Sequence, residues 1–323
     1  MTELAITIDD ISSAHDRIRQ QVRRTPCLRA RFLRDTPAAA KFALTLKLEC
    51  LQVSGSFKAR GASNKAALLD TTQLRRGLIT ASGGNHALGV AYAGWRHGAP
   101  VHVVVPCSTA ASKLARLRYW GAKVTIEGEV WDEANSVALR IAELDGLTYI
   151  HPFADPQVMA GQGTVALEIL KQCKDIDTVL VAIGGGGLIA GIATAIKALK
   201  PDTAVIGVEP IGAPTLSRSV AAGEVITLDR ITTVAGTLAP RTSDAKNLAI
   251  ISTLVDDIVL VSDDEMRDAA QHLWFEMGLS VELSAAAALA ALRTARYVPQ
   301  TGEHVCIVIC GAGEDGASLP TAS

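Results

Sequence analysis

Short apolar segments alternate with amphipathic helical segments along most of this chain. The apolar segments cover residues 78–80, 101–105, 124–126, 147–150, 178–183, 205–208, 258–261 and 305–309. Between most of them, apolar residues recur at helical spacing, as in residues 131–144 and 263–277. Strands that are regularly separated by helices form parallel sheets with right-handed crossovers. The pattern therefore predicts an α/β protein with an open parallel-sheet architecture.

Other segments have local signals of their own. Residues 7–22 have helical spacing, and two acidic residues stand in the first turn, where negative charge is favourable. The alternating run 42–49 predicts a strand. A helix is expected soon after it, with Ser54 and Ser56 as residues able to cap its first turn. Residues 223–256 mix Thr, Pro and Asp and are expected to be irregular.

The composition excludes several classes of protein. In 323 residues, 49% are hydrophobic and the formal net charge is -2, so the chain is globular and has no strong field to attract nucleic acid. No apolar run reaches the roughly 18 residues of a membrane span. The six cysteines are scattered without a C-x-x-C pair, which favours reduced thiols, no zinc site and a cytoplasmic location.

Lys58 stands in the first turn of the helix expected after the Ser54–Ser56 turn. The positive end of a helix disfavours a protonated amine, and a neutral amine can attack a carbonyl to form a Schiff base. A second interpretation is a solvent-exposed lysine at the start of a helix. The residues around Lys58 leave both interpretations open.

Four consecutive glycines, Gly184, Gly185, Gly186 and Gly187, lie between a buried strand and a helix. Backbone amides without side chains can approach an anion closely, so the turn predicts a phosphate site. An alternative is that the glycines serve only tight strand–helix packing. A further alternative is a nicotinamide dinucleotide site, because Gly185, Gly187 and Ala190 fit G-x-G-x-x-A and Glu209 ends the next strand.

Several motifs taken in order resemble the serine/threonine dehydratase and serine racemase family of pyridoxal-phosphate enzymes. They are Thr25-Pro26, Lys47-x-Glu49-x-Leu51-Gln52, residues 54–62, residues 82–87, His151-Pro152-Phe153, residues 161–164, residues 184–187, Val208-Glu209-Pro210 and Cys310-Gly311. The resemblance implies the tryptophan-synthase-β-like fold (fold type II). It also implies a large cofactor-binding domain of residues 1–48 and 151–323, a small mobile domain of residues 49–150, and a homodimer.

The resemblance also assigns roles to residues. Lys58 would bind pyridoxal phosphate covalently and later move the α-proton, and Phe57 would cover one face of the ring. The phosphate would be held by the amides of Gly184, Gly185, Gly186, Gly187 and Leu188. Asn85 would bond the 3′-oxygen of the cofactor, and the substrate carboxylate would lie against Ser82, Gly83, Asn85 and His86. Glu282 would either face the cofactor or begin a helix.

Cys310 falls where the family meets the pyridine nitrogen. A neutral thiol stabilises a protonated ring less than a carboxylate does, so the ring becomes a weaker electron sink. This favours β-elimination, in which a 3-hydroxy amino acid such as threonine or serine yields a 2-oxo acid and ammonia. The expected activity is therefore that of a hydroxy amino acid ammonia-lyase (dehydratase).

The chain departs from the family pattern at several positions. Gly83 replaces the serine by which the racemases reprotonate the opposite face, so efficient racemisation is not expected. Extra room at Gly83 and the apolar Leu88 would suit a bulkier substrate such as 3-phenylserine, and 3-hydroxyaspartate is another alternative. The usual Ala-Asp-Gly segment is Ala235-Gly236-Thr237.

Two further departures concern regulation and metal binding. Some relatives bind a divalent cation through the equivalents of Glu209, the Ala213 carbonyl and an aspartate. Thr215 replaces that aspartate, so no tight metal site is expected. The chain ends soon after Gly316, and from this we expect a catabolic enzyme without a regulatory extension.

Overall fold

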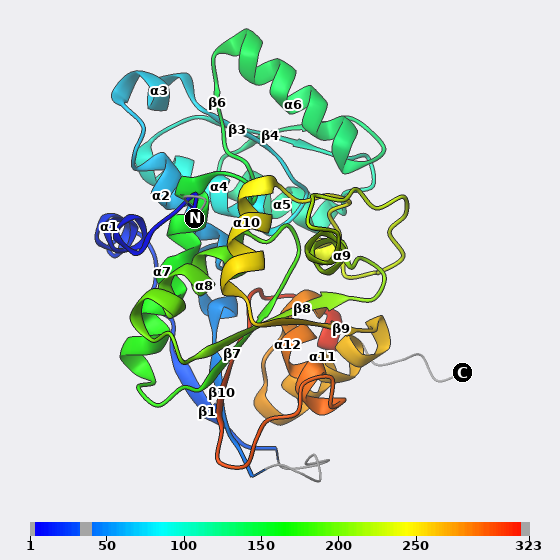
Figure 1. The fold of residues 1–323 in the computed structure, drawn as a ribbon. Coiled ribbons are helices and arrows are strands. Elements are labelled where there is room, and N and C mark those ends of the chain that lie inside the picture. Colours follow the sequence, from blue (N-terminus) through cyan, green and yellow to red (C-terminus); the bar gives the residue numbers. More distant parts are fainter. Residues whose placement is uncertain (1–3, 33–40, 318–323) are drawn as a thin grey trace.

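The computed structural model describes residues 4–32 and 41–317, and their strands form two sheets (Figure 1). The larger sheet has the order β1-β2-β10-β7-β8-β9, and its neighbouring strands are parallel except for β1 and β2. Its strands are β1 (Cys27–Ala30), β2 (Ala43–Lys47), β7 (Thr178–Ala182), β8 (Ala204–Pro210), β9 (Asp257–Val261) and β10 (His304–Val308). The predicted α/β class with open parallel sheets is therefore confirmed, with one antiparallel edge strand that the sequence pattern did not indicate.

The smaller sheet is parallel throughout and has the order β5-β4-β3-β6. Its strands are β3 (Leu78–Ala81), β4 (Val101–Val105), β5 (Lys123–Ile126) and β6 (Thr148–Tyr149). Leu78 and Val103 belong to one buried cluster, together with α2 (Lys58–Ala66), α4 (Asn85–His97) and α5 (Ala111–Tyr119). Ile79 and Val104 belong to a second cluster, with α6 (Trp131–Asp145). Successive residues of a strand point to opposite faces, so the helices cover both faces of this sheet.

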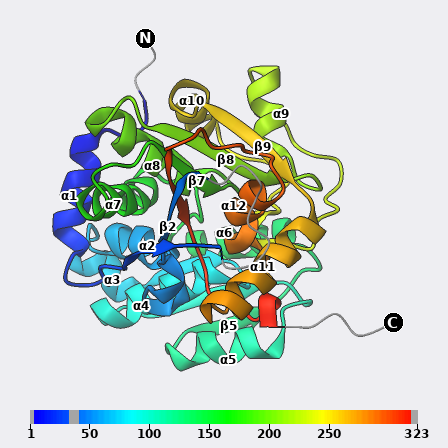
Figure 2. The same ribbon diagram turned by 90° about the horizontal axis from the view of Figure 1, so that it is seen from below.

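Helices cover both faces of the larger sheet as well (Figures 1 and 2). On one side lie α7 (Pro156–Gln172), α8 (Gly187–Leu199) and α10 (Ala245–Leu254), with α1 (Ile8–Ile18) packed on α7. On the other side lie α11 (Asp263–Met277) and α12 (Leu283–Arg293). Two shorter α-helices are α3 (Thr71–Arg76) and α9 (Thr215–Ala222). Within the described residues, no helix is long and apolar enough to span a membrane.

The local structure predicted from the sequence agrees with the observed structure at α1 but differs from it at α10 and α2. Thr7 caps α1 as the spacing suggests, since the amide of Asp10 donates to its hydroxyl at 3.3 Å. The expectation of an irregular segment over residues 223–256 is wrong at its end, where Asp244 caps α10 and the helix buries Leu248 and Ile251. The proposed serine caps of α2 are also wrong. Phe57 occupies the cap position, while the backbone of Ser56 is extended and pairs with Gly311.

Candidate active site

Four turns of chemical interest follow strands β2, β3, β7 and β10, at the carboxyl ends where open α/β sheets bind ligands. The turns after β2 and β10 are joined directly. Ser56 pairs with Gly311, and the Phe57 amide donates to the carbonyl of Cys310 at 3.2 Å. Phe57 and Cys310, which lie 253 positions apart in the sequence, are therefore held side by side.

Lys58 is the first residue of α2, as predicted. Its Nζ donates to the carbonyl of Pro152 at 2.7 Å and lies 5.2 Å from the centroid of the Phe57 ring. Burial lowers the pKa of Lys58 to about 8, although the neighbouring Cys310 and Glu282 partly offset this effect. An amine with this pKa loses its proton readily near neutral pH, which suits covalent capture of an aldehyde.

Two neighbouring helices hold α2 in close backbone contact. A Cβ atom added at Gly89 of α4 would lie 2.9 Å from the carbonyl carbon and oxygen of Lys58. A Cβ atom added at Gly161 of α7 would lie 2.6 Å from Cα of Gly61. Real Cβ atoms do not come so close to backbone, so glycine is required at both crossings. Lys58 thus projects from a helix that has little room to shift.

The glycine turn after β7 leads into α8. Gly186 has φ 95° and precedes the helix, a conformation that favours glycine. A Cβ atom at Gly185 would lie 2.2 Å from the Phe153 ring, and one at Gly184 would lie 2.9 Å from the Thr237 carbonyl. The turn is therefore packed tightly, and it also presents the unpaired first amides of α8, a suitable cradle for a phosphate. The side chain of Leu188 is buried in the core, so only its amide is available.

The site also contains three residues that follow other strands or precede helices: Asn85, Glu282 and Cys310. Asn85 Nδ2 donates to Glu282 Oε1 at 2.8 Å, and burial raises the pKa of Glu282. Glu282 is the cap residue of α12, so it begins a helix as one of the two interpretations expected, and its side chain contacts Asn85. Burial and the nearby Glu282 raise the pKa of the Cys310 thiol well above its ordinary value. The thiol is therefore neutral.

The turn after β3 brings Ser82, Gly83, Asn85 and His86 to the start of α4. Ser82 Oγ accepts from the Gly84 amide at 3.2 Å. The His86 side chain is 3% exposed, and its Nε2 donates to the Ile150 carbonyl at 2.9 Å. Burial, together with the charge of Lys58, lowers the pKa of His86 well below its ordinary value. The imidazole is therefore neutral and turned to Ile150, and the first amides of α4 are the groups open to a carboxylate.

Two threonines at the site had no assigned role from the sequence. Thr237 Oγ1 donates to Ser284 Oγ at 2.6 Å. Thr237 also lies near both glycine turns, because its Cγ2 would be 3.8 Å from a Cβ atom added at Gly84 and its carbonyl oxygen 2.9 Å from one added at Gly184. The sequence signal for Thr237 is that it lies in Ala235-Gly236-Thr237, which replaces the usual Ala-Asp-Gly segment of the family. Thr109 Oγ1 would lie 2.8 Å from a Cβ atom added at Gly83. The expectation of extra room at Gly83 is therefore wrong, because a loop that follows β4 fills the space.

Glu209 has a local structural role. Its carboxylate accepts from the amides of Leu216 and Ser217, both at 2.8 Å, at the start of α9. Burial raises the pKa of Glu209 to about 7, which the two amides only partly offset. Thr215 Oγ1 donates to the Pro240 carbonyl at 2.8 Å. Among the described residues, no group of three or more His, Cys, Asp or Glu side chains is placed to hold a metal ion.

Known proteins decide between the two cofactors. Residues 18–311 match the family described as pyridoxal-phosphate dependent enzyme. The chain belongs to this family. Its cofactor is therefore pyridoxal phosphate, and the nicotinamide alternative built on Gly185, Gly187, Ala190 and Glu209 falls. The site fits this cofactor, with a lysine of lowered pKa on one side and the amide cradle at α8 on the other.

The sequence relatives have different activities. The chain is 37% identical to an L-threonine ammonia-lyase of Thermotoga maritima, over 96% of this chain and 76% of that protein. It is 36% identical to a serine racemase of Arabidopsis thaliana, over 98% and 95%. It is also 36% identical to a phenylserine dehydratase of Ralstonia pickettii, over 99% and 98%. The resemblance seen in the motifs is thus confirmed for the family.

Solved structures confirm the fold type. Maize serine racemase superposes with a TM-score of 0.89 at 35% identity, covering 96% of this chain and 94% of that one. A pyridoxal 5'-phosphate-dependent aspartate racemase superposes with a TM-score of 0.90 at 32% identity, covering 99% of both chains. The architecture is that of fold type II.

Proposed function

We propose that this enzyme eliminates water from a 3-hydroxy amino acid, and that water then hydrolyses the enamine product to a 2-oxo acid and ammonia. The observation that carries the proposal is the buried, neutral thiol of Cys310. In the proposed arrangement this thiol meets the pyridine nitrogen, and it stabilises a full negative charge on the substrate poorly. A reaction in which the hydroxyl leaves as the α-proton is removed is least affected.

The residues of the site divide the work as follows. Bound pyridoxal phosphate supplies the electron sink that makes the α-proton acidic. Lys58, with a pKa near 8, accepts that proton at Nζ. Ser82 and the first amides of α4 bind the substrate carboxylate, and Asn85, held by Glu282, orients the bound group. Gly83 offers no proton to the opposite face, so racemisation is disfavoured.

A bulkier 3-hydroxy amino acid is the second candidate substrate. The phenylserine dehydratase relative matches over nearly the full length of both chains, which favours it. Gly83 and Leu88 do not favour it. Thr109 fills the space at Gly83, and Leu88 is buried in the core of the smaller sheet. Threonine or serine therefore remains the first candidate, and 3-hydroxyaspartate is a further one.

We further propose that residues 49–150 form a small domain that closes over the substrate and excludes water. Residues 1–48 and 151–323 would form the large domain, and the enzyme would act as a homodimer in the cytoplasm. Light scattering of the purified protein tests the dimer. Small-angle scattering with and without a substrate analogue tests the closure.

The decisive experiment compares the visible absorbance of the wild type with that of Lys58→Ala, with Lys65→Ala on the same helix as the control. A yellow band of lysine-bound cofactor in the wild type and the control, absent from Lys58→Ala, supports the role of Lys58. The wild type is then incubated with threonine, serine, 3-phenylserine and 3-hydroxyaspartate. Release of 2-oxo acid and ammonia supports the proposal, whereas accumulation of the opposite enantiomer without ammonia contradicts it.

A further inference from the structure

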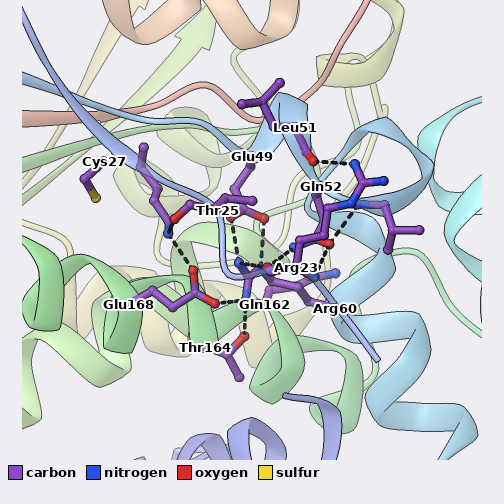
Figure 3. Close-up of polar contacts among 12 residues, drawn as sticks. Arg23, Thr25, Cys27, Glu49, Leu51, Gln52, Arg60, Gln162, Thr164 and Glu168 are labelled. Atoms are coloured by element: carbon purple, nitrogen blue, oxygen red, sulfur yellow. Dashed lines mark hydrogen bonds and ion pairs between the residues drawn. The ribbon is translucent and has the colours of Figure 1, made fainter. Parts of the chain in front are cut away.

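Two residues after Lys58, helix α2 buries a complete guanidinium group. The Arg60 side chain is 1% exposed. Its Nε and Nη2 donate to the two carboxylate oxygens of Glu49, both at 2.8 Å, and its Nη1 donates to Glu168 at 2.8 Å (Figure 3). Nη1 also contacts Thr164 Oγ1 at 3.2 Å, and Nη2 contacts the Arg23 carbonyl at 3.4 Å. All five N–H groups of the guanidinium therefore have an acceptor.

The charges around Arg60 balance. Lys47 donates to Glu168 at 2.6 Å and to the Thr25 carbonyl at 2.7 Å, so two basic groups and two carboxyl groups form one buried cluster. Burial alone would lower the pKa of Arg60, but Glu49 and Glu168 outweigh it and raise the pKa. Burial would raise the pKa of Glu49, but Arg60 outweighs it and lowers the pKa. Arg60 and Glu49 are therefore charged, and loss of either would leave an uncompensated charge in the interior.

The cluster joins the elements that surround Lys58. Lys47 ends β2, Glu49 follows it, and Glu168 lies on α7. Strand β2 pairs with β10, which leads to Cys310, and α7 begins shortly after Pro152, whose carbonyl receives the Lys58 amine. The guanidinium of Arg60 therefore connects α2 to Glu49, which follows β2, and to Glu168 on α7. These elements are linked in turn to Cys310, through β10, and to Pro152, which Lys58 contacts.

Arg60 cannot act on the reaction directly. Residues two apart on an α-helix point about 200° apart around its axis, so Lys58 and Arg60 face opposite ways. Burial is the main cause of the lowered pKa of Lys58, and the neighbouring groups that also affect it are Cys310 and Glu282, not Arg60. Any effect of Arg60 on Lys58 must therefore come through the position of the helix.

We infer that Arg60 is a positioning residue, which holds α2 so that the Lys58 amine stays at the Pro152 carbonyl beside Cys310. The inference rests on the proposed role of Lys58. Helix α2 has little freedom to shift. In addition to the ion pairs of Arg60, α2 and α7 touch at Gly61 and Gly161, and Gln162 accepts from the Gly61 amide at 3.2 Å. A lysine at position 60 keeps the charge but cannot bind Glu49 through two parallel donors while also reaching Glu168.

The test uses Arg60→Lys and, as a milder change, Thr164→Val. The control is Lys65→Met. It removes a different ion pair between α2 and α7, in which Lys65 Nζ lies 2.7 Å from the carboxylate of Asp155, the cap residue of α7. Each purified apo protein is checked for folding by circular dichroism. The rate at which it captures pyridoxal phosphate is then followed by the visible band across a range of pH. The pKa of the Lys58 amine is measured separately in the apo protein by NMR after reductive ¹³C-methylation.

In Arg60→Lys we expect capture to slow roughly 10- to 100-fold, since a misplacement of about 1 Å has effects of this size. The pKa of Lys58 should return toward that of an ordinary lysine. Thr164→Val should show a smaller change in the same direction, and Lys65→Met should match the wild type within about twofold. A folded Arg60→Lys protein with the wild-type capture rate and Lys58 pKa overturns the inference. Should Arg60→Lys not fold, an unchanged Lys58 pKa in Thr164→Val overturns it. A yellow band retained by Lys58→Ala would instead show that the proposed role of Lys58 is wrong.

Discussion

Asn85 Nδ2 and Glu282 Oε1 lie 2.8 Å apart and join residues that are 197 positions apart in the sequence. Asn85 opens α4, beside the smaller sheet, and Glu282 immediately precedes α12, beside the larger one. The contact therefore connects the two sheets across the candidate site. It also explains why Gly311 is required, since a Cβ atom there would lie 2.5 Å from the same Glu282 oxygen.

Replacement of Glu282 tests this contact. Glu282→Ala leaves the Asn85 amide without its acceptor, so we expect unfolding to become easier by about 1–3 kcal/mol. Glu282→Gln keeps an oxygen for Asn85 and resembles the protonated carboxyl, so it should lie close to the wild type at acidic pH, where Glu282 is protonated. Thermal unfolding of the three proteins measures both effects. Equal stability of Glu282→Ala and the wild type would contradict the contact.

The raised pKa of Glu282 also predicts a pH dependence of stability. A carboxyl with a folded-state pKa above its unfolded value binds protons more tightly when folded. Its contribution is full below the unfolded pKa and is lost as the pH rises through the folded one. Glu282→Gln does not titrate, so its stability should fall less with rising pH than that of the wild type. Parallel curves would contradict the raised pKa.

Cofactor capture should follow the pKa of Lys58. The attacking form is the neutral amine, and burial lowers the pKa of Lys58 to about 8. The rate at which apo protein develops the yellow band should therefore rise with pH and level off above about 8, far below the value for an exposed lysine. Stopped-flow absorbance measures this profile. A rate that keeps rising toward pH 10 would show that the amine is not perturbed.

Gly83 and Thr109 should be energetically coupled. The Cβ atom of a serine at position 83 would lie 2.8 Å from Thr109 Oγ1, so Gly83→Ser should destabilise the protein by about 1–3 kcal/mol. In a Thr109→Ala background most of this penalty should disappear. Urea unfolding of the four proteins gives the coupling energy, expected to exceed about 0.5 kcal/mol. Additive effects would place the two residues out of contact.

The crossing of α2 and α7 should not tolerate a methyl group. Gly161→Ala would place Cβ 2.6 Å from Cα of Gly61, and backbone cannot yield as a side chain does. We expect the free energy of unfolding to fall by about 1–3 kcal/mol and the rate of cofactor capture to fall as well. Gly236→Ala is the matched control, because no heavy atom lies within 4 Å of an added Cβ there. Its stability should change by no more than about 1 kcal/mol. Comparable losses in both variants would show that the crossing is looser than described.

Much of the fold followed from local patterns in the sequence. Helix α11 spans the predicted residues 263–277. Such elements are readable because hydrophobic periodicity and capping act within a few residues. Helix α10 was missed because its signal, an Asp244 cap followed by apolar residues, is short and lies in a polar segment.

The parts of the site that could not be predicted depend on distant partners. Nothing near Gly83 in the sequence indicates Thr109, and nothing near Lys58 indicates the Pro152 carbonyl, 94 positions away. The expected caps at Ser54 and Ser56 failed for the same reason. Pairing of Ser56 with Gly311 places the backbone at this turn, and local preference does not.

The sequence by itself determined the α/β class, the lysine at the start of a helix, the glycine turn and the family to which these motifs point. Tertiary structure alone decided that Arg60 is enclosed by Glu49 and Glu168, that His86 is neutral and turned to Ile150, and that Lys58 has a pKa near 8. The physical reason is range. Helical spacing and turn preference are set by neighbours in the chain, whereas desolvation and ion pairing depend on which distant segments pack together.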